Sequence, residues 1–62
     1  SLLGQQVEGL AESGRTVQGT VERITVEDNK VKLVVGEETV LLENIRTVSF
    51  PSNGFLGINP WS

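Results

Sequence analysis

The 62-residue chain contains no cysteine, histidine, tyrosine or methionine, and it has only two prolines and three aromatic residues. Without cysteine it can form neither a disulfide nor a thiolate metal site. Without histidine it lacks the commonest metal ligand and the usual proton shuttle near neutral pH. No apolar run approaches the roughly 18–20 residues of a membrane-spanning helix. A small domain without cross-links must depend on one hydrophobic core.

Positive charge is also scarce, with five Lys and Arg residues against eight Asp and Glu residues and a net charge of −3. This sign disfavours binding to nucleic acid, which requires contacts with phosphates. The glycines do not form a phosphate-binding motif. The chain begins with Ser rather than Met, so we expect a domain of a longer protein or a processed chain.

Side chains for catalysis are missing as well. The serines have no histidine base beside them, and Lys30 and Lys32 flank Val31 in a predicted hairpin, where both are expected to point into solvent. The acidic pairs 27–28 and 37–38 also fall at predicted turns, where we expect solvated charge rather than a cation site. We therefore expect no enzymatic activity, no metal, no cofactor and no small-molecule substrate.

What the chain has in abundance is Val, Leu and Ile, which together make up 19 of the 62 residues. They occur in short runs separated by glycines, a texture typical of an all-β domain. The pattern predicts five strands, over residues 2–7, 15–27, 31–35, 39–42 and 46–50. The predicted connections are a loop over 9–14, hairpin turns over 28–30 and 36–38, and one turn of 3₁₀ helix over 43–45.

The second predicted strand changes its apolar phase. Val17 and Val21 occupy odd positions, whereas the apolar residues that follow, Ile24 and Val26, occupy even ones. Because side chains alternate between the two faces of a strand, this change requires a bulge or a sharp bend, which we place at Glu22–Arg23. Gly19 would supply local flexibility for the bend.

Five short strands with a bent second one predict a small five-stranded SH3-like (tudor-like) barrel over residues 1–50, followed by an irregular tail over 51–62. An open five-stranded meander and half of a β-sandwich are the alternative architectures. The predicted core consists of Val7, Val17, Val21, Ile24, Val26, Leu33, Val35, Val40, Leu42, Ile45 and Val48.

The tail differs in composition from the rest of the chain, because it is uncharged and holds both prolines and the single Trp. Its large apolar residues must be buried or remain adhesive, so they are the candidate partner contacts: Phe55, Leu56, Ile58 and Trp61. A methyl-lysine cage would instead require Phe50, Phe55 and Trp61 to converge. The simpler interpretation is that Phe50 plugs one end of the barrel and the tail covers its base.

Four segments form an ordered set: residues 1–7 (SLLGQQV), 17–21 (VQGTV), 31–36 (VKLVVG) and 40–48 (VLLENIRTV). Taken in this order, they resemble the tudor-like barrel of the flagellar hook-capping proteins, which are assembly scaffolds of the bacterial flagellum. That family shows an opening SLIGK-x-V, a G-x-V-x-x-V strand, an apolar strand ending at Gly, and a closing V-x-L-x-D-I-x-x-V. Asn44 stands where the family usually has Asp. Many members insert a further domain after the first strand, which this chain lacks, and the tail has no counterpart.

The resemblance implies a non-catalytic role in hook assembly. It implies that the partners are hook subunits and other copies of the same protein, with no nucleic acid and no membrane. It also implies a location at the hook tip, reached by export without a cleaved signal peptide.

Two other barrel families show a similar spacing of glycine and apolar residues: the C-terminal domain of the ribosome maturation factor and the PRC-barrel. Either would make the chain an SH3-like adaptor of another assembly, and a ligand-reading barrel is a further alternative. The net charge of −3 argues against direct contact with RNA.

Overall fold

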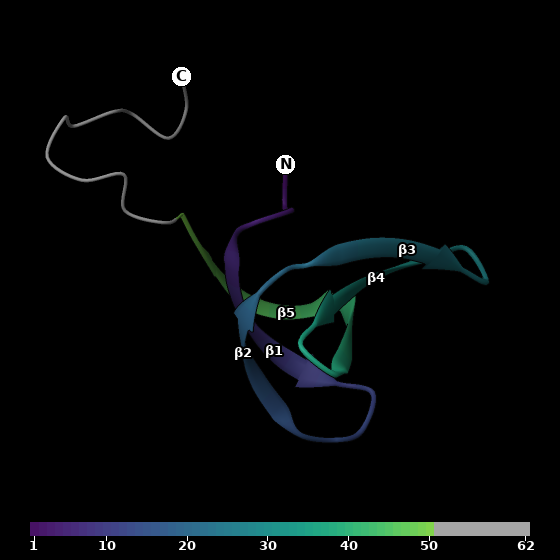
Figure 1. The fold of residues 1–62 in the computed structure, drawn as a ribbon. Helices are drawn as coiled ribbons and strands as arrows, with labels where there is room; N and C mark the ends of the chain where they lie inside the picture. Colours follow the sequence, from purple (N-terminus) through teal and green to yellow (C-terminus); the bar gives the residue numbers. More distant parts are fainter. Residues whose placement is uncertain (51–62) are drawn as a thin grey trace, which may run out of the picture.

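The computed structural model describes residues 1–50, which form one antiparallel β-sheet (Figure 1). This part of the chain contains no helix, and the predicted all-β class with five strands is confirmed. The order of the strands across the sheet is β2-β1-β5-β4-β3. The strands are β1 (Gln6–Ala11), β2 (Thr16–Thr20), β3 (Arg23–Glu27), β4 (Lys30–Val35) and β5 (Glu38–Ser49).

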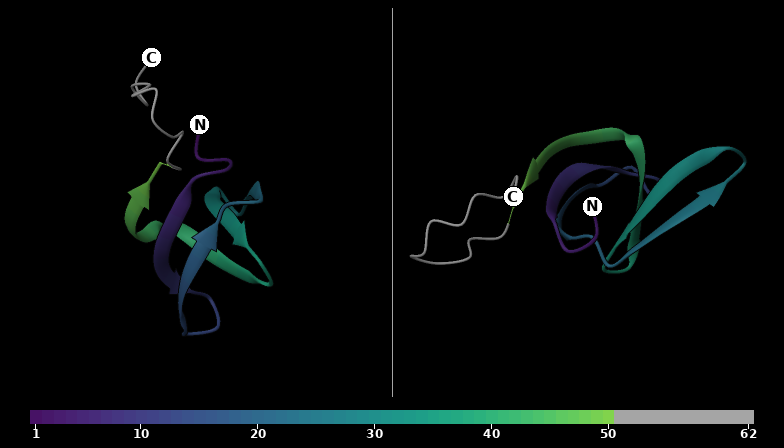
Figure 2. Two further views of the ribbon diagram at one scale, coloured as in Figure 1. Left: turned by 60° about the vertical axis from the view of Figure 1, so that its left-hand side comes forward. Right: turned by 90° about the horizontal axis from the view of Figure 1, so that it is seen from above.

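The sheet is curled, because β2 and β3 lie at its two opposite edges although only two residues join them. The Val21 amide donates to the Gln5 carbonyl beside β1, whereas the next amide, that of Glu22, donates to the Val34 carbonyl of β4, both at 2.9 Å. Consecutive amides therefore attach the chain to both ends of the sheet. Figure 2 shows the resulting curvature of β5 and the β3–β4 hairpin extending away from β1 and β2. Closure into a complete barrel stays a prediction.

The predicted single strand over residues 15–27 was wrong, because the chain divides at Val21–Glu22 into β2 and β3. The irregularity predicted at Glu22–Arg23 is present at the start of β3. Arg23 is the Cα partner of Val34, and the Glu22 amide donates to the same residue, so two residues face one across the ladder. Gly19, which we expected to provide flexibility, has a different role. A Cβ atom there would lie 2.9 Å from Cγ1 of Val35, so glycine allows β2 to pack closely on β4.

Two of the hairpin turns follow from local chemistry. Asp28 and Asn29 have φ angles of 53° and 64°, which is the type I′ geometry that Asp and Asn tolerate. Gly36 has a φ of 61° at the first position of the next two-residue loop, the pattern of a type II′ turn. Both turns are shorter by one residue than predicted, since Lys30 and Glu38 already belong to β4 and β5.

The prediction for the first strand was wrong. The strand runs over residues 6–11 rather than 2–7, and the connection predicted over residues 9–14 lies over residues 12–15, between β1 and β2. The buried positions of β1 are Val7, Gly9 and Ala11. Because two of these three residues are small, the inward face of the strand carries little hydrophobic signal.

The predicted 3₁₀ turn over residues 43–45 was also wrong. Residues 39–42 and 46–50 do not form separate strands, because β5 continues from Glu38 to Ser49. The irregularity lies in the pairing instead: Glu8 pairs with Thr47, but Gly9 pairs with Ile45 and Ala11 pairs with Val40. Bulges in β5 thus absorb the residues that leave the ladder, and its backbone remains extended.

The core is built from small and medium apolar side chains. Of the eleven residues predicted to be in it, Val7, Val21, Leu33, Val35 and Val40 are buried. Val17 and Ile45 are partly buried and pack against them, as do Leu2 and Val31, and Ala11 is buried as well. Four predicted core residues are exposed, because nothing in residues 1–50 covers them: Ile24 (37% exposed), Val26 (69%), Leu42 (42%) and Val48 (42%).

Replacing Leu33 tests this division between core and rim. Leu33 has no exposed surface, so Leu33→Ala should cost about 2–4 kcal/mol, close to the whole stability of so small a domain. Val26→Ala is the control, and at this exposed position the change should stay within about 0.5 kcal/mol. Urea unfolding followed by circular dichroism measures both. Equal losses in the two variants would contradict the assignment.

Gly9 marks the closest approach of β1 to β5. A Cβ atom at this position would lie 2.5 Å from the Asn44 carbonyl oxygen and 3.1 Å from Cα of Ile45. Both are backbone atoms, which cannot rotate away as a side chain would. Any residue other than glycine must therefore push the two strands apart.

Gly9→Ala should lower the free energy of unfolding by about 2–3 kcal/mol through this clash. Gly14→Ala is the matched control, because Gly14 has a φ of 93° but no atom near the added methyl. That variant should cost only the conformational strain of about 1 kcal/mol. Thermal and urea unfolding of both chains compare the two costs, and a Gly9→Ala chain as stable as the control would show that the strands can separate freely.

Candidate functional site

The tail residues predicted to contact partners, Phe55, Leu56, Ile58 and Trp61, lie outside the described residues. Phe50, expected to plug one end of the barrel, is 42% exposed. The site that residues 1–50 offer is therefore found elsewhere, among the apolar side chains that the core leaves uncovered.

Four apolar side chains gather near the tip of the β3–β4 hairpin. Val26 is the direct partner of Val31 across the hairpin, and Val31 lines one hollow together with Leu42. Ile24 lies on the same face of β3 as Val26, two residues along the strand. We refer to Ile24, Val26, Val31 and Leu42 as the hairpin patch.

The hairpin patch is a continuation of the core. Ile24 pairs with Leu33, and Leu33 in turn pairs with Val40, so a single row of side chains runs from an exposed edge into the buried interior. The β1–β2 hairpin lies over one part of the curled sheet only, while the β3–β4 hairpin projects beyond it (Figure 2). The inward face of that projecting part is left without a covering layer.

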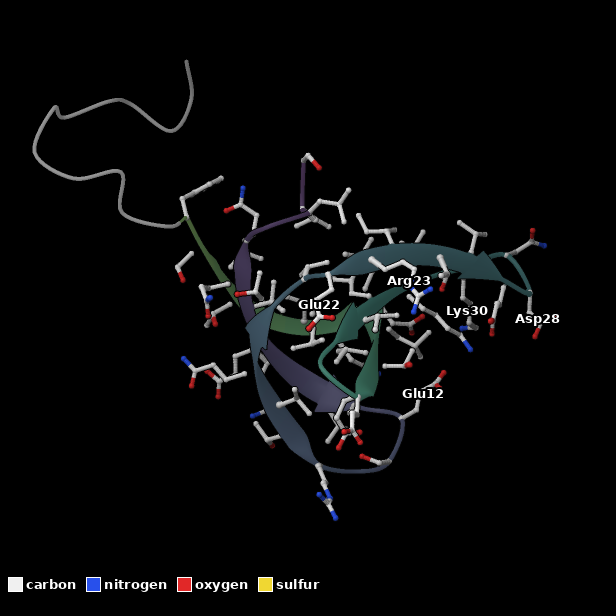
Figure 3. All side chains as sticks on the ribbon, viewed as in Figure 1. Glu12, Glu22, Arg23, Asp28 and Lys30 are labelled. Atoms are coloured by element: carbon white, nitrogen blue, oxygen red, sulfur yellow. The ribbon has the colours of Figure 1, made fainter. Side chains whose placement is uncertain are left out.

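Polar and charged groups border the patch. Asp28, Asn29, Lys30 and Glu43 line a hollow of about 420 Å³ whose apolar wall is Val31 and Leu42. The Lys30 Nζ atom lies 3.2 Å from Oε1 of Glu43, and Figure 3 shows Asp28 and Lys30 at the end of the hairpin. An apolar centre with a charged rim is the arrangement found in protein–protein contact surfaces.

The opposite face of the hairpin is held by Lys32. Its Nζ atom lies 2.8 Å from Oε2 of Glu12 and 3.1 Å from Oε1 of Glu27, and its side chain is only 16% exposed. The expectation that Lys30 and Lys32 both point into solvent is therefore wrong for Lys32. Because Glu12 belongs to the β1–β2 loop, this ion pair ties that loop to the β3–β4 hairpin. The carboxylates of Glu12 and Glu27 raise the pKa of Lys32 above its ordinary 10.5.

The acidic side chains make structural contacts. Glu27 pairs with Lys32, Glu38 accepts a hydrogen bond of 2.9 Å from the Ser13 hydroxyl, and Glu22 accepts one of 3.1 Å from the Gly36 amide. Within residues 1–50 no three acidic side chains come together as metal ligands would. In the same range no helix is long and apolar enough to cross a bilayer.

Comparison with known proteins gives no relative. No protein-family model matches the chain, and neither a curated protein nor a solved structure is similar to it. The hairpin patch therefore has to be interpreted from its own geometry.

The hydrophobic pattern contained the hairpin patch but could not identify it as a surface. Ile24, Val26 and Leu42 follow a two-residue apolar period just as Leu33 and Val40 do, so all five were assigned to the core. One available signal was distance from the turn: Val26 lies beside the turn of the β3–β4 hairpin, and Leu42 lines the same hollow as the turn residues Asp28 and Asn29.

The contact of Lys32 with Glu12 gives a titration that can be measured. Replacing Glu12 by Gln should lower the pKa of Lys32, because Glu12 makes the largest contribution to raising it. Glu27→Gln should lower it less, and Glu37→Gln, at an exposed turn residue, should leave it unchanged. Side-chain NMR of Lys32 through alkaline pH reports the values.

The same shift fixes a pH dependence of stability. A lysine whose pKa is higher in the folded chain stabilises the fold below its unfolded pKa, and this contribution is lost as the pH rises through the folded value. The loss should therefore occur above pH 10.5 and should be smaller in Glu12→Gln. An identical Lys32 titration in the native chain and in Glu12→Gln would contradict the role of this contact.

Proposed function

We propose that the chain is a non-catalytic assembly domain that binds other proteins through the hairpin patch. The observation that supports this most directly is the continuity of exposed Ile24 and Val26 with the buried row of Leu33 and Val40. Side chains of this kind lower their free energy by leaving water, at roughly 25 cal/mol for each Å² buried. A partner that covers the patch supplies that burial.

The chemistry of the patch defines the kind of partner. Its centre is aliphatic, so it suits apolar or aromatic side chains of another protein. Its rim carries both signs of charge, in Asp28, Lys30 and Glu43, so it suits a partner with polar groups at the edge of its own contact surface. Phosphates suit it poorly, because Lys30 is already neutralised by Glu43.

The resemblance to the hook-capping proteins gives this binding a specific context. We propose that the chain belongs to a scaffold at the tip of the flagellar hook and that it contacts hook subunits there. The adaptor barrels of the ribosome maturation factor and of PRC-barrel proteins are the alternative contexts. All three share a role in assembly without catalysis.

Assembled flagellar hook protein is the probe that tests both the context and the surface. The native chain should bind to it, and the Val26→Ser/Leu42→Ser double variant should bind about tenfold more weakly or worse, because the apolar centre of the patch is lost. Co-sedimentation with the polymer, or its immobilisation on a biosensor, measures the affinity. Both replaced residues are exposed, so the variant should remain folded, which circular dichroism verifies.

Leu10→Ser is the matched control. Leu10 is 39% exposed, but it lies between buried Gly9 and Ala11 in β1, so its side chain points to the other face of the sheet. This variant should bind like the native chain. Equal binding of the control and the double variant would overturn the hairpin patch as the contact surface, and no binding of the native chain would overturn the assignment to the hook.

A further inference from the structure

Among residues 1–50, strand β3 forms one edge of the sheet, since β4 is its one pairing partner there. The hairpin closes on Glu27 and Lys30 through a two-residue turn, and the Glu22 amide donates to Val34 at the other end. In an antiparallel ladder the backbone groups of successive residues point alternately to the two sides. The groups of Arg23, Thr25 and Glu27 therefore face β4, and those of Ile24 and Val26 face outward.

The side chains of this edge strand carry opposite charges at its two ends. Arg23 begins the strand and Glu27 ends it, with Thr25 at the centre and one apolar residue on either side of it. Arg23 makes no ion pair among residues 1–50, and its side chain lies along the hairpin in Figure 3. A strand with this pattern is complementary to itself when it is turned around.

We propose that two copies of the chain associate by antiparallel pairing of β3 with β3 around a twofold axis at Thr25. In this register Arg23 of each copy faces Glu27 of the other, and Ile24 of each copy faces Val26 of the other. The outward amides and carbonyls of Ile24 and Val26 then form the hydrogen-bonded pairs across the interface. The contact is the same from both sides, as a twofold dimer requires.

Other registers are less favourable. A shift by one residue would place the outward amides and carbonyls of each copy opposite backbone groups that are already hydrogen-bonded to β4. A shift by two residues would leave one hydrogen-bonded residue pair between the two β3 strands, either Ile24 with Ile24 or Val26 with Val26. It would also separate Arg23 of one copy from Glu27 of the other. Parallel pairing would bring like charges together. Just beyond the strand, this register brings Glu22 of one copy toward Asp28 of the other. The Gly36 amide holds the Glu22 carboxylate toward its own chain, and Asp28 leaves the line of the strand in the turn.

Pairing of the two edges also joins the two hairpin patches. Ile24 and Val26 of one copy continue onto those of the other, so the apolar surface extends across the axis on one face of the joined sheet. On the opposite face Glu27 can accept from Lys32 of its own chain and from Arg23 of the second copy. This inference rests on the proposed function, because it names a second copy of the chain as one partner of the hairpin patch.

Charge exchange in the 62-residue chain tests the register. Arg23→Glu places two facing acidic pairs in the dimer, and Glu27→Arg places two facing basic pairs. Each variant should dimerise about tenfold more weakly than the native chain or worse, because attraction at two cross-strand pairs becomes repulsion. An equimolar mixture of the two variants should recover association, because the acidic residues of one variant then face the basic residues of the other. The Arg23→Glu/Glu27→Arg double variant should recover association alone. Sedimentation velocity over a range of concentrations measures these affinities.

Arg46→Glu is the control, since this exposed residue lies in β5 and away from the β3 edge. It should associate like the native chain. Glu27→Arg also removes an ion pair to Lys32, so circular dichroism and a urea midpoint must verify that it is folded. A native chain that stays monomeric at millimolar concentration, or single variants whose mixture does not associate, would overturn the proposed pairing.

Amide hydrogen exchange adds a readout at the interface itself. The Ile24 and Val26 amides should exchange rapidly in dilute chain and become protected as concentration rises, and Arg23→Glu should abolish that protection. Concentration-independent exchange at both amides would also overturn the pairing. The charge variants retain the whole hairpin patch, so if they and the native chain remain monomeric but bind hook protein equally, only this inference fails. If the patch variant binds hook protein as well as the native chain does, the proposed function fails.

Discussion

The close approach of β1 to β5 at Gly9 is the constraint on which the rest of this fold depends. A Cβ atom at position 9 would lie 2.5 Å from the Asn44 carbonyl oxygen. Because glycine has no such atom, β5 can bend closely over β1 while it remains a single strand. That bend lets β5 pair with β4 along its first part and with β1 along its last part. It also explains why the inward positions of β1 beyond Val7 are occupied by Gly9 and Ala11, because the space between the strands is narrow.

A narrow interior limits what the sheet can cover. The core is filled by a few aliphatic side chains around Leu33 and Val40, and the short β1 and β2 strands do not extend over the far end of the β3–β4 hairpin. Exposed Val26 and Leu42 are the consequence. In a domain with so little buried surface, an uncovered apolar face lowers solubility unless a partner uses it, and Lys30 and Glu43 border it with charge. The fold and the exposed hairpin patch therefore share one origin.

The features that depend on local chemistry were predictable from the sequence. Asp28–Asn29 and Gly36 specify their turns through their tolerance of positive φ, and the change of apolar phase after Val21 specifies the bulge. The first strand was misplaced because Gly9 and Ala11 carry no hydrophobic signal, and the 3₁₀ turn was wrong because β5 absorbs Asn44 in a bulge. Alternation shows which face of a strand is apolar but not whether another layer covers it, so Ile24, Val26, Leu42 and Val48 were assigned to the core. The candidate contacts in the tail lie outside the described residues, and no feature of the pattern pointed to the β3 edge.

The pairing of the first strand with the last has a consequence for how the chain acquires its fold. Val7 pairs with Val48, so the contacts that complete the sheet join positions near the two ends of residues 1–50. Contacts between distant positions are slow to form, because the intervening chain loses entropy before they stabilise it. During synthesis, β1 and β2 can form only an isolated hairpin until the end of β5 has left the ribosome, and a two-stranded hairpin is marginally stable. The pairing of β1 with the end of β5 is therefore the step that completes the sheet, whereas β3, β4 and the first part of β5 adjoin in the sequence and can pair before it.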